Sequence, residues 1–296
     1  MISRRQFLQV AGISVYGLSS AQMADVLGLV LPASAASQEA AFGRLLYPAP
    51  VTDDLGIVIS SLIPDTVVQI ISSSAATYTL NQGVVSRSAI QPMADFGAAS
   101  FVPDTPCPVE VIAPVAAVRQ WCEPSAPLIS RVGHGGVLHM VDSLEVGGAR
   151  WLGIASDPNA PLMGWTEAVR WREAASQSEE FSVADTLQLN RHTQQLSVFN
   201  GDRLLWGASA AVSQAMPAGT YPLDGRVVSS VLPEAGLMGT PWIHNFSGYS
   251  LSGAYWHNQF GLDAGRSMVG APIQLQPSAA RWIYRHFRSN GVLHVV

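Results

Sequence analysis

The chain of 296 residues contains no lysine, so all 16 of its basic residues are arginine. Enzymes that form a Schiff base through lysine, pyridoxal-phosphate enzymes and P-loop nucleotide-binding proteins are therefore excluded, because each needs a lysine amine at a fixed place. Only two cysteines occur, too few for a four-cysteine zinc site, although they could form a disulfide or supply a nucleophile. Charged residues make up 12% of the chain and the net charge is −5, which offers no basic surface for nucleic acid.

The N-terminus has the pattern of an export signal. Arg4 and Arg5 precede a moderately apolar run that ends in the small residues Ala33-Ser34-Ala35. The arginine pair resembles the twin-arginine signature of proteins that are exported folded. Asp25 interrupts the run, so a full membrane span is not available. We expect residues 1–35 to be this signal and the protein to lie in the periplasm, cell wall or outside the cell, touching the membrane only through an uncleaved signal; the alternative is an ordinary amphipathic helix.

The next part of the chain is predicted to be rich in β-strands. Residues 40–172 consist of short apolar runs separated by Gly, Pro, Ser and Asp, without helical periodicity. From about residue 113 the pattern resembles the bacterial SH3-like domain, a small barrel. The segments that carry this resemblance are Val118-Arg119, Pro124-Ser125, Gly135–Leu138, Trp151–Ile154 and Gly164-Trp165. We therefore expect an SH3-like barrel over residues 107–172 and a possible degenerate copy of it over residues 40–106.

A polar linker is expected over residues 173–182, followed by a last domain over residues 183–296. Two alternating segments flank Asn200-Gly201, which predicts a hairpin because both residues tolerate positive φ. The one convincing helix is predicted from Pro277 to about Arg288, with apolar residues spaced along one face and arginines along the other.

This last domain resembles the catalytic domain of L,D-transpeptidases, which cross-link peptidoglycan stem peptides. The resemblance covers roughly residues 183–290. The matching segments, in chain order, are Met216–Tyr221, Thr240–Trp242, Phe246–Tyr249, Gly253–Gly261 and Leu275–Trp282. The resemblance implies an L,D-transpeptidase-type β-sandwich with a C-terminal helix.

The residues that would perform the family's chemistry are missing. The resemblance implies a cysteine thiolate as nucleophile, a histidine that takes its proton, and backbone N–H groups facing the developing oxyanion. At the corresponding positions this sequence has Ser252 and Gly270 for the histidines and Pro272 for the cysteine. A shift of one residue places Ala271 at the cysteine position instead. Proline also lacks the backbone N–H of an oxyanion donor.

Either the two cysteines or a serine of the last domain would have to replace the missing thiol nucleophile. Cys107 and Cys122 lie outside the last domain and, in an oxidising compartment, are expected to form a disulfide with each other, or else to remain as two buried thiols. Ser267 or Ser252 could serve as nucleophile if His257 acts as the base.

Tyr255, Trp256, His257 and Asn258 are the best-retained residues of the site region. They either fill the core beneath the groove or form a groove wall that still contacts glycan or stem peptides. The seven histidines do not occur as His-x-x-x-His or beside an acidic pair, so neither a metal site nor a cofactor is expected.

We therefore expect a mainly β protein: one or two SH3-like barrels followed by an L,D-transpeptidase-type domain. Its expected role is a catalytically inactive envelope protein that binds peptidoglycan or an envelope partner. The alternatives are an active L,D-transpeptidase, a peptidoglycan cross-linking acyltransferase, or a related hydrolase with an unrecognised nucleophile, and a structural scaffold.

Overall fold

The computed structural model describes residues 42–174, 182–213, 216–232, 236–261 and 269–296. The chain divides into two units, residues 1–34 and residues 35–296, and everything described below belongs to the second unit. The predicted export signal lies outside the described residues. Within the described part of the chain, no helix has the length and apolar character needed to cross a membrane.

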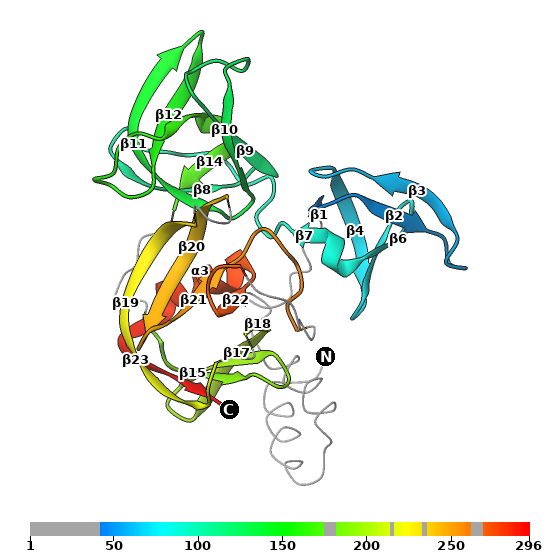
Figure 1. Cartoon of the computed structure of the whole chain (residues 1–296), viewed down its shortest axis with the longest axis vertical. Coiled ribbons are helices and arrows are strands. Elements are labelled where there is room, and N and C mark those ends of the chain that lie inside the picture. Colours follow the sequence, from blue (N-terminus) through cyan, green and yellow to red (C-terminus); the bar gives the residue numbers. More distant parts are fainter. Residues whose placement is uncertain (1–41, 175–181, 214–215, 233–235, 262–268) are drawn as a thin grey trace, which may run out of the picture. The chain divides into compact units, whose positions relative to one another are not determined.

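The N-terminal module, residues 42–92, is one seven-stranded antiparallel sheet (Figure 1). Its strand order is β3-β2-β6-β5-β4-β1-β7. Alternation along β4 places Val68 and Ile70 in the core of this module while Val67 and Ile71 stay exposed. The strands are β1 (Phe42–Leu45), β2 (Ala49–Thr52), β3 (Val58–Leu62), β4 (Val67–Ser73), β5 (Thr77–Leu80), β6 (Gly83–Ser86) and β7 (Ile90–Pro92), with a 3₁₀ turn, η1 (Arg87–Ala89), before β7.

The middle module, residues 107–173, repeats this topology strand for strand. Its order is β10-β9-β13-β12-β11-β8-β14, which is the order of the first sheet with every number raised by seven. The strands are β8 (Cys107–Val111), β9 (Val115–Arg119), β10 (Leu128–Gly133), β11 (Val137–Val146), β12 (Ala149–Ala155), β13 (Gly164–Glu167) and β14 (Trp171–Glu173), again with a 3₁₀ turn, η2 (Ala168–Arg170), before the last strand. The two modules thus share one topology; their SH3-like identity stays a prediction.

The C-terminal module, residues 184–295, has nine strands in the order β17-β16-β15-β23-β19-β20-β21-β22-β18. Helix α3 (Pro277–His286) packs against β20 and β21 (Figure 1). The strands are β15 (Ala184–Asn190), β16 (Gln195–Asn200), β17 (Arg203–Ser209), β18 (Ala211–Val212), β19 (Gly219–Leu232), β20 (Leu237–Phe246), β21 (Tyr249–Gly253), β22 (Ile273–Leu275) and β23 (Phe287–Val295). The predicted mainly β fold with a helix near the C-terminus is confirmed.

Helix α3 begins where the sequence predicts and ends two residues earlier. Pro277 occupies its first turn, where the missing N–H has no intrahelical partner to lose. Ala280 and Ile283 are buried as expected, but Phe287 is the first residue of β23 rather than the last apolar position of the helix. The chain turns directly into β23 because its buried side chains complete the sheet between β15 and β19.

The middle and C-terminal modules are in contact through β20, which packs against β10 and β11. Gly239 of β20 has a φ of 70°, and a Cβ added there would lie 2.7 Å from the carbonyl oxygen of Val137 in β11. A residue with a side chain would therefore push the two backbones apart.

Candidate site at the end of strand β21

The predicted site positions converge at the ends of two neighbouring strands. Strands β21 and β22 run parallel, and Ser252 is opposite Gln274 in their register. Ser252 is fully buried, and its hydroxyl has no hydrogen-bond partner in the structure. A histidine in place of Ser252, which the family motif requires, would need space that this buried position does not offer.

Gln274 organises the chain around it through three hydrogen bonds. Its Nε2 donates to the carbonyl oxygens of Val269, at 2.6 Å, and Ala271, at 3.0 Å. Its Oε1 lies 2.6 Å from Nε2 of His257. The amide is almost fully buried, so these bonds are protected from water. Gln274 therefore clamps the loop that carries the motif positions and joins it to His257.

These contacts fix the tautomer of His257. Because the Gln274 amide nitrogen already donates to two carbonyls, its oxygen faces the imidazole, and Nε2 of His257 must carry the proton. The other ring nitrogen, Nδ1, accepts the backbone N–H of Gln259 at 3.2 Å. Burial lowers the pKa of His257, and the bond to Gln274 opposes this shift. The imidazole therefore has no free lone pair with which to deprotonate a serine.

The loop positions in place of the second histidine and the cysteine are structural. Gly270 has a φ of 97°, and a Cβ there would lie 3.0 Å from Leu232 and 3.4 Å from the amide of Gln274. Pro272 has no N–H, and its carbonyl oxygen accepts the N–H of Ser213 at 2.8 Å. Ser267, the possible substitute nucleophile, lies outside the described residues.

Both cysteines lie in the middle module and are free thiols in the structure, so the expected disulfide is not formed in it. Burial raises the pKa of Cys107 to about 11, with the charge of Glu173 adding to the shift. Burial also raises the pKa of Cys122, with a further contribution from Asp142. A raised pKa keeps a thiol protonated and unreactive at neutral pH, because the thiolate is the nucleophile.

The segment predicted as a groove wall contacts the other modules. Tyr255 is buried with the core of the middle module, and its hydroxyl donates to the carbonyl oxygen of Met238 at 2.6 Å. Burial raises the pKa of this hydroxyl. The carbonyl oxygen of Tyr255 accepts Nη2 of Arg44, in β1, at 3.0 Å. Trp256 is partly buried against the same core.

Asn258 reaches the N-terminal module as well. Its buried Nδ2 donates to the hydroxyl of Tyr78 at 3.2 Å and to the carbonyl oxygen of Arg87 at 3.0 Å. Of the four groove-wall residues, Tyr255 and Asn258 are covered by the protein itself, whereas Trp256 and His257 keep partial exposure.

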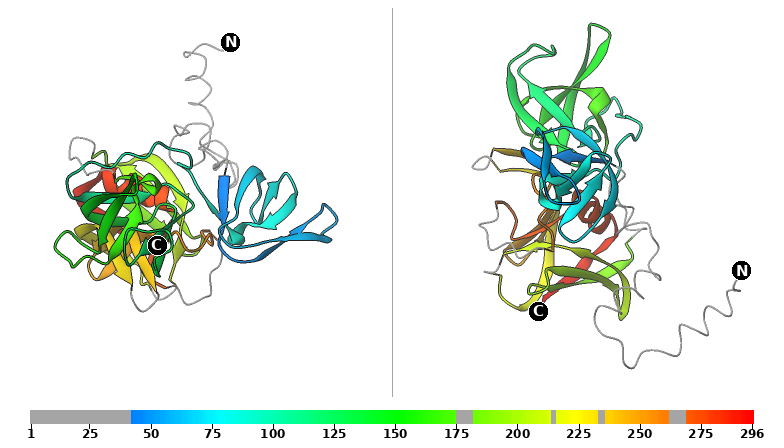
Figure 2. Two further views of the ribbon diagram at one scale, coloured as in Figure 1. Left: turned by 90° about the horizontal axis from the view of Figure 1, so that it is seen from above. Right: turned by 90° about the vertical axis from the view of Figure 1, so that its right-hand side faces the viewer.

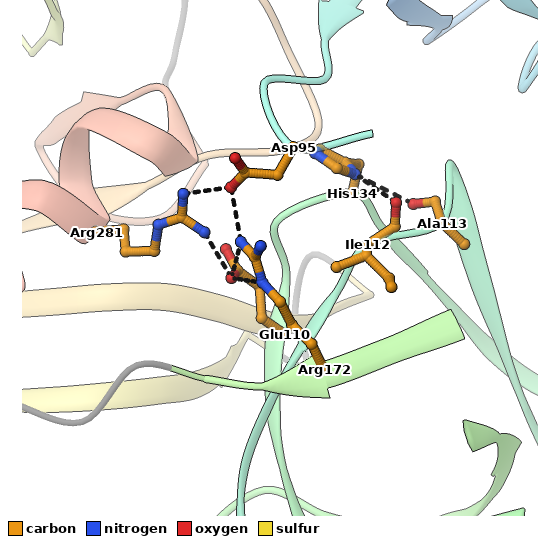
Figure 3. A network of polar contacts seen from close by, with 7 residues as sticks. All are labelled: Asp95, Glu110, Ile112, Ala113, His134, Arg172 and Arg281. Carbon is orange, nitrogen blue, oxygen red and sulfur yellow. Dashed lines mark hydrogen bonds and ion pairs between the residues drawn. The ribbon is translucent and has the colours of Figure 1, made fainter. Parts of the chain in front are cut away.

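A cluster of charges around the buried Glu110 joins three parts of the chain, and sequence reasoning missed it (Figure 3). Nη2 of Arg172 lies 2.7 Å from Glu110 and 2.7 Å from Asp95. Arg281 of α3 contacts the same two carboxylates, reaching Glu110 at 2.8 Å. Asp95 follows β7, Glu110 and Arg172 belong to the middle module, and Arg281 belongs to the C-terminal module. The helix arginine therefore does not lie on a solvated face but holds modules together.

The cluster has unusual protonation equilibria. Burial raises the pKa of Glu110 to about 7, Arg281 opposes this shift, and Asp95 adds to it. Nearby, burial lowers the pKa of His134 to about 4, and its Nδ1 lies 3.1 Å from the carbonyl oxygen of Ile112. Among the described residues, no group of three or more His, Cys, Asp or Glu side chains is arranged to hold a metal ion.

Comparisons with known proteins return structural neighbours alone: no family model and no curated protein matches the sequence. A crystal structure of an L,D-transpeptidase from Stackebrandtia nassauensis aligns at 13% identity and a TM-score of 0.33, covering 41% of this chain and 58% of that one. The catalytic domain of an E. faecium L,D-transpeptidase aligns at 12% identity and a TM-score of 0.33, covering 38% of this chain and 96% of that one. An L,D-transpeptidase from Mycobacterium smegmatis aligns at 11% identity and a TM-score of 0.32, covering 68% of this chain and 95% of that one. The matched part of this chain thus spans a little over half of the Stackebrandtia structure.

Proposed function

We propose that this chain is an exported envelope protein whose C-terminal module has the L,D-transpeptidase type of fold without its chemistry, and that it binds peptidoglycan. The sequence segments that resemble the family support the first part. The contacts of Gln274 support the loss of the family's chemistry, because this residue ties the motif loop and His257 into a closed hydrogen-bond network. A catalytic site needs a nucleophile and a base that are free to exchange protons.

The remaining groups near Ser252 support the same conclusion. A serine nucleophile requires an adjacent base. His257 donates from Nε2 and accepts at Nδ1, so both ring nitrogens are occupied. The two thiols of the chain belong to a different module and carry raised pKa values. Removing a nucleophile or its base costs an enzyme several orders of magnitude in rate.

Trp256 is the residue on which we base the proposed binding. Its indole is partly exposed, a Cβ added at Gly270 of the motif loop would lie 3.5 Å from it, and the rings of Tyr255 and His257 flank it. A partly exposed indole offers a flat apolar face on which a sugar ring or an alanine-rich peptide can stack. Peptidoglycan provides both of these.

The test is to incubate the purified full chain with purified sacculi, then to measure pelleting and to analyse the stem peptides for new cross-links by mass spectrometry. We expect pelleting without new cross-links, and at least a several-fold loss of pelleting in Trp256→Ala. Trp121→Ala is the matched control, because Trp121 is an exposed tryptophan of the middle module, 48% accessible. New cross-links that disappear in Ser267→Ala would show an active enzyme and overturn the proposal.

A structural scaffold is the second candidate, and one observation favours it. Tyr255 and Asn258 of the retained segment contact Arg44, Tyr78 and Arg87 of the N-terminal module. The segment would then serve to fix the modules to each other rather than to bind a polymer. Neither pelleting nor cross-links in the sacculus experiment would favour this function.

A further inference from the structure

The N-terminal and middle modules share one topology but differ in what covers the first strand of the sheet order. In the middle module this strand is β10, which packs against β20 of the C-terminal module. In the N-terminal module it is β3, which forms ladder hydrogen bonds with β2 and lies at the edge of its sheet (Figures 1 and 2). Among the strands of the described residues, none pairs with the outer edge of β3, which therefore presents its backbone N–H and C=O groups.

The β3 edge is also strongly apolar. Of the six large aliphatic side chains of β3 and its flanking turns, Leu62 packs against the core and the other five are more than half exposed: Leu55 84%, Ile57 59%, Val58 62%, Ile59 54% and Ile63 70%. No charged residue occurs from position 55 to position 64. Natural edge strands are usually protected from pairing by lysine, proline or an inward-pointing charge. The equivalent strand β10 carries Arg131, which forms an ion pair with Asp65, whereas β3 carries no such residue.

The turn that leads into β3 is held in one conformation. Oδ1 of Asp53 accepts the N–H groups of Leu55 and Ile57, each at 2.9 Å. The Asp53 N–H in turn donates to the carbonyl oxygen of Ile57 at 3.0 Å, and Gly56 has a φ of 79°. These contacts fix the backbone of the turn that carries Leu55 and Ile57 before a partner binds, which lowers the entropic cost of association.

We propose that β3 is a dimer interface, at which the β3 strands of two copies of this chain pair antiparallel across a twofold axis and join the two sheets. An uncharged strand does not repel its own copy, and an antiparallel pair of identical strands is self-complementary. Each face of β3 carries a serine and at least one aliphatic side chain, so the paired strands bury Val58 on one side of the joined sheet and Ile59 on the other.

The area available suits a reversible dimer. At roughly 100 Å² for each mostly exposed aliphatic side chain, the five residues offer about 500 Å² per copy. The total of about 1,000 Å² is at the lower end of the range for specific interfaces. We therefore expect a dissociation constant in the micromolar range rather than an obligate dimer.

The first test is sedimentation velocity on the full chain over a range of concentrations. We expect a monomer–dimer equilibrium that Ile59→Arg weakens at least tenfold, because the variant replaces an exposed aliphatic side chain of β3 with a charge that its own copy would repel. Val169→Arg is the matched control, since Val169 is 70% exposed but lies in η2 of the middle module. A wild-type chain that stays monomeric at 100 µM, or equal weakening by both variants, would overturn the proposal.

The second test locates the interface. In a symmetric antiparallel pair one residue faces its own copy at a separation that a disulfide can bridge. Ser60→Cys and Ser61→Cys cover the two central positions, and mild oxidation should cross-link one of them into a covalent dimer. Ser86→Cys, which changes an exposed residue of β6, should give no covalent dimer. A dimer in solution that neither β3 cysteine cross-links would place the interface elsewhere and refute the assignment.

Discussion

Glu110 of β8 offers the sharpest test of how the modules are held together. Its carboxylate is almost fully buried and contacts Arg172 at 2.7 Å and Arg281 at 2.8 Å. Burial raises its pKa from 4.5 to about 7 against the opposing charge of Arg281. Glu110→Gln keeps the shape of the side chain and removes the ionisation, so the variant corresponds to the protonated form of Glu110.

The size of the expected effect follows from the pKa. A rise of the pKa from 4.5 to about 7 corresponds to about 3 kcal/mol in the free energy of unfolding. Because the folded pKa exceeds the unfolded value, the folded state binds a proton that the unfolded state has lost between pH 4.5 and 7. The stability that Glu110 contributes is therefore complete below pH 4.5 and is lost as the pH rises through 7. We expect wild type to lose about 3 kcal/mol relative to Glu110→Gln between pH 4 and pH 8.

The assay is chemical denaturation of both proteins at pH 4, 6 and 8, taking the difference in free energy of unfolding at each pH. Burial lowers the pKa of His134 to about 4 and of His244 to about 3, so these two histidines destabilise the fold as the pH falls below 6.5. They are present in both proteins and cancel in the difference. Glu167→Gln, which breaks the more exposed pair with Arg170, serves as control and should cost less than about 1 kcal/mol.

A difference that moves in the other direction would refute this reasoning. If wild type gains stability over Glu110→Gln as the pH rises, the two guanidiniums outweigh burial and hold the pKa of Glu110 below 4.5. A difference that does not change with pH would mean that Glu110 titrates alike in the folded and unfolded states, and that the cluster does not perturb it.

Three further predictions concern the candidate site. Asn258→Ala should lower the free energy of unfolding by about 2 kcal/mol, measured by urea denaturation, because it removes a buried hydrogen bond to Tyr78 and a partly buried one to the carbonyl oxygen of Arg87; an unchanged stability would mean that these contacts do not form in solution. Gln274→Glu should raise the pKa of His257, measured by NMR titration, because a carboxylate replaces the amide oxygen 2.6 Å from Nε2; an unchanged titration would contradict the tautomer derived above. Pro272→Cys should react with a thiol probe at pH 8 faster than Cys107 or Cys122, whose pKa values burial raises; slower labelling in a folded variant would count against the motif alignment.

Local patterns in the sequence were sufficient to predict much of the fold. The hairpin predicted at Asn200-Gly201 joins β16 to β17, but its turn lies one residue later, at Gly201-Asp202: Asn200 pairs with Arg203 in the ladder, and Gly201 has a φ of 56°. The start of α3 at Pro277 follows from the same kind of local preference. Its end was not predictable from local patterns, since Phe287 continues the helical spacing but is needed as the first residue of β23.

The site required contacts that no local pattern encodes. Motif spacing predicted Ser252 and the loop of Gly270 and Pro272 as site positions; Ser252 lies in β21 opposite Gln274 of β22, and the loop leads into β22. It did not reveal Gln274 as the clamp, since one glutamine carries no signal until its three partners are known. The contact of Asn258 with Tyr78 spans 180 positions of the chain and depends on how whole modules pack.

At the module junctions, arginine makes sets of contacts that lysine could not make. Arg281 uses two N–H groups to reach two different carboxylates, and Arg44 contacts Asp65, the amide of Gln91 and the carbonyl oxygen of Tyr255. A lysine has one compact ammonium without the planar fork, so it would lose part of each set of contacts. In a chain with few charges, such buried groups meet little competition from alternative partners on the surface. The absence of lysine also bears on the β3 edge. Edge strands are commonly protected from pairing by a lysine, and since β3 has none, its exposed aliphatic residues are covered only when a second strand pairs with it.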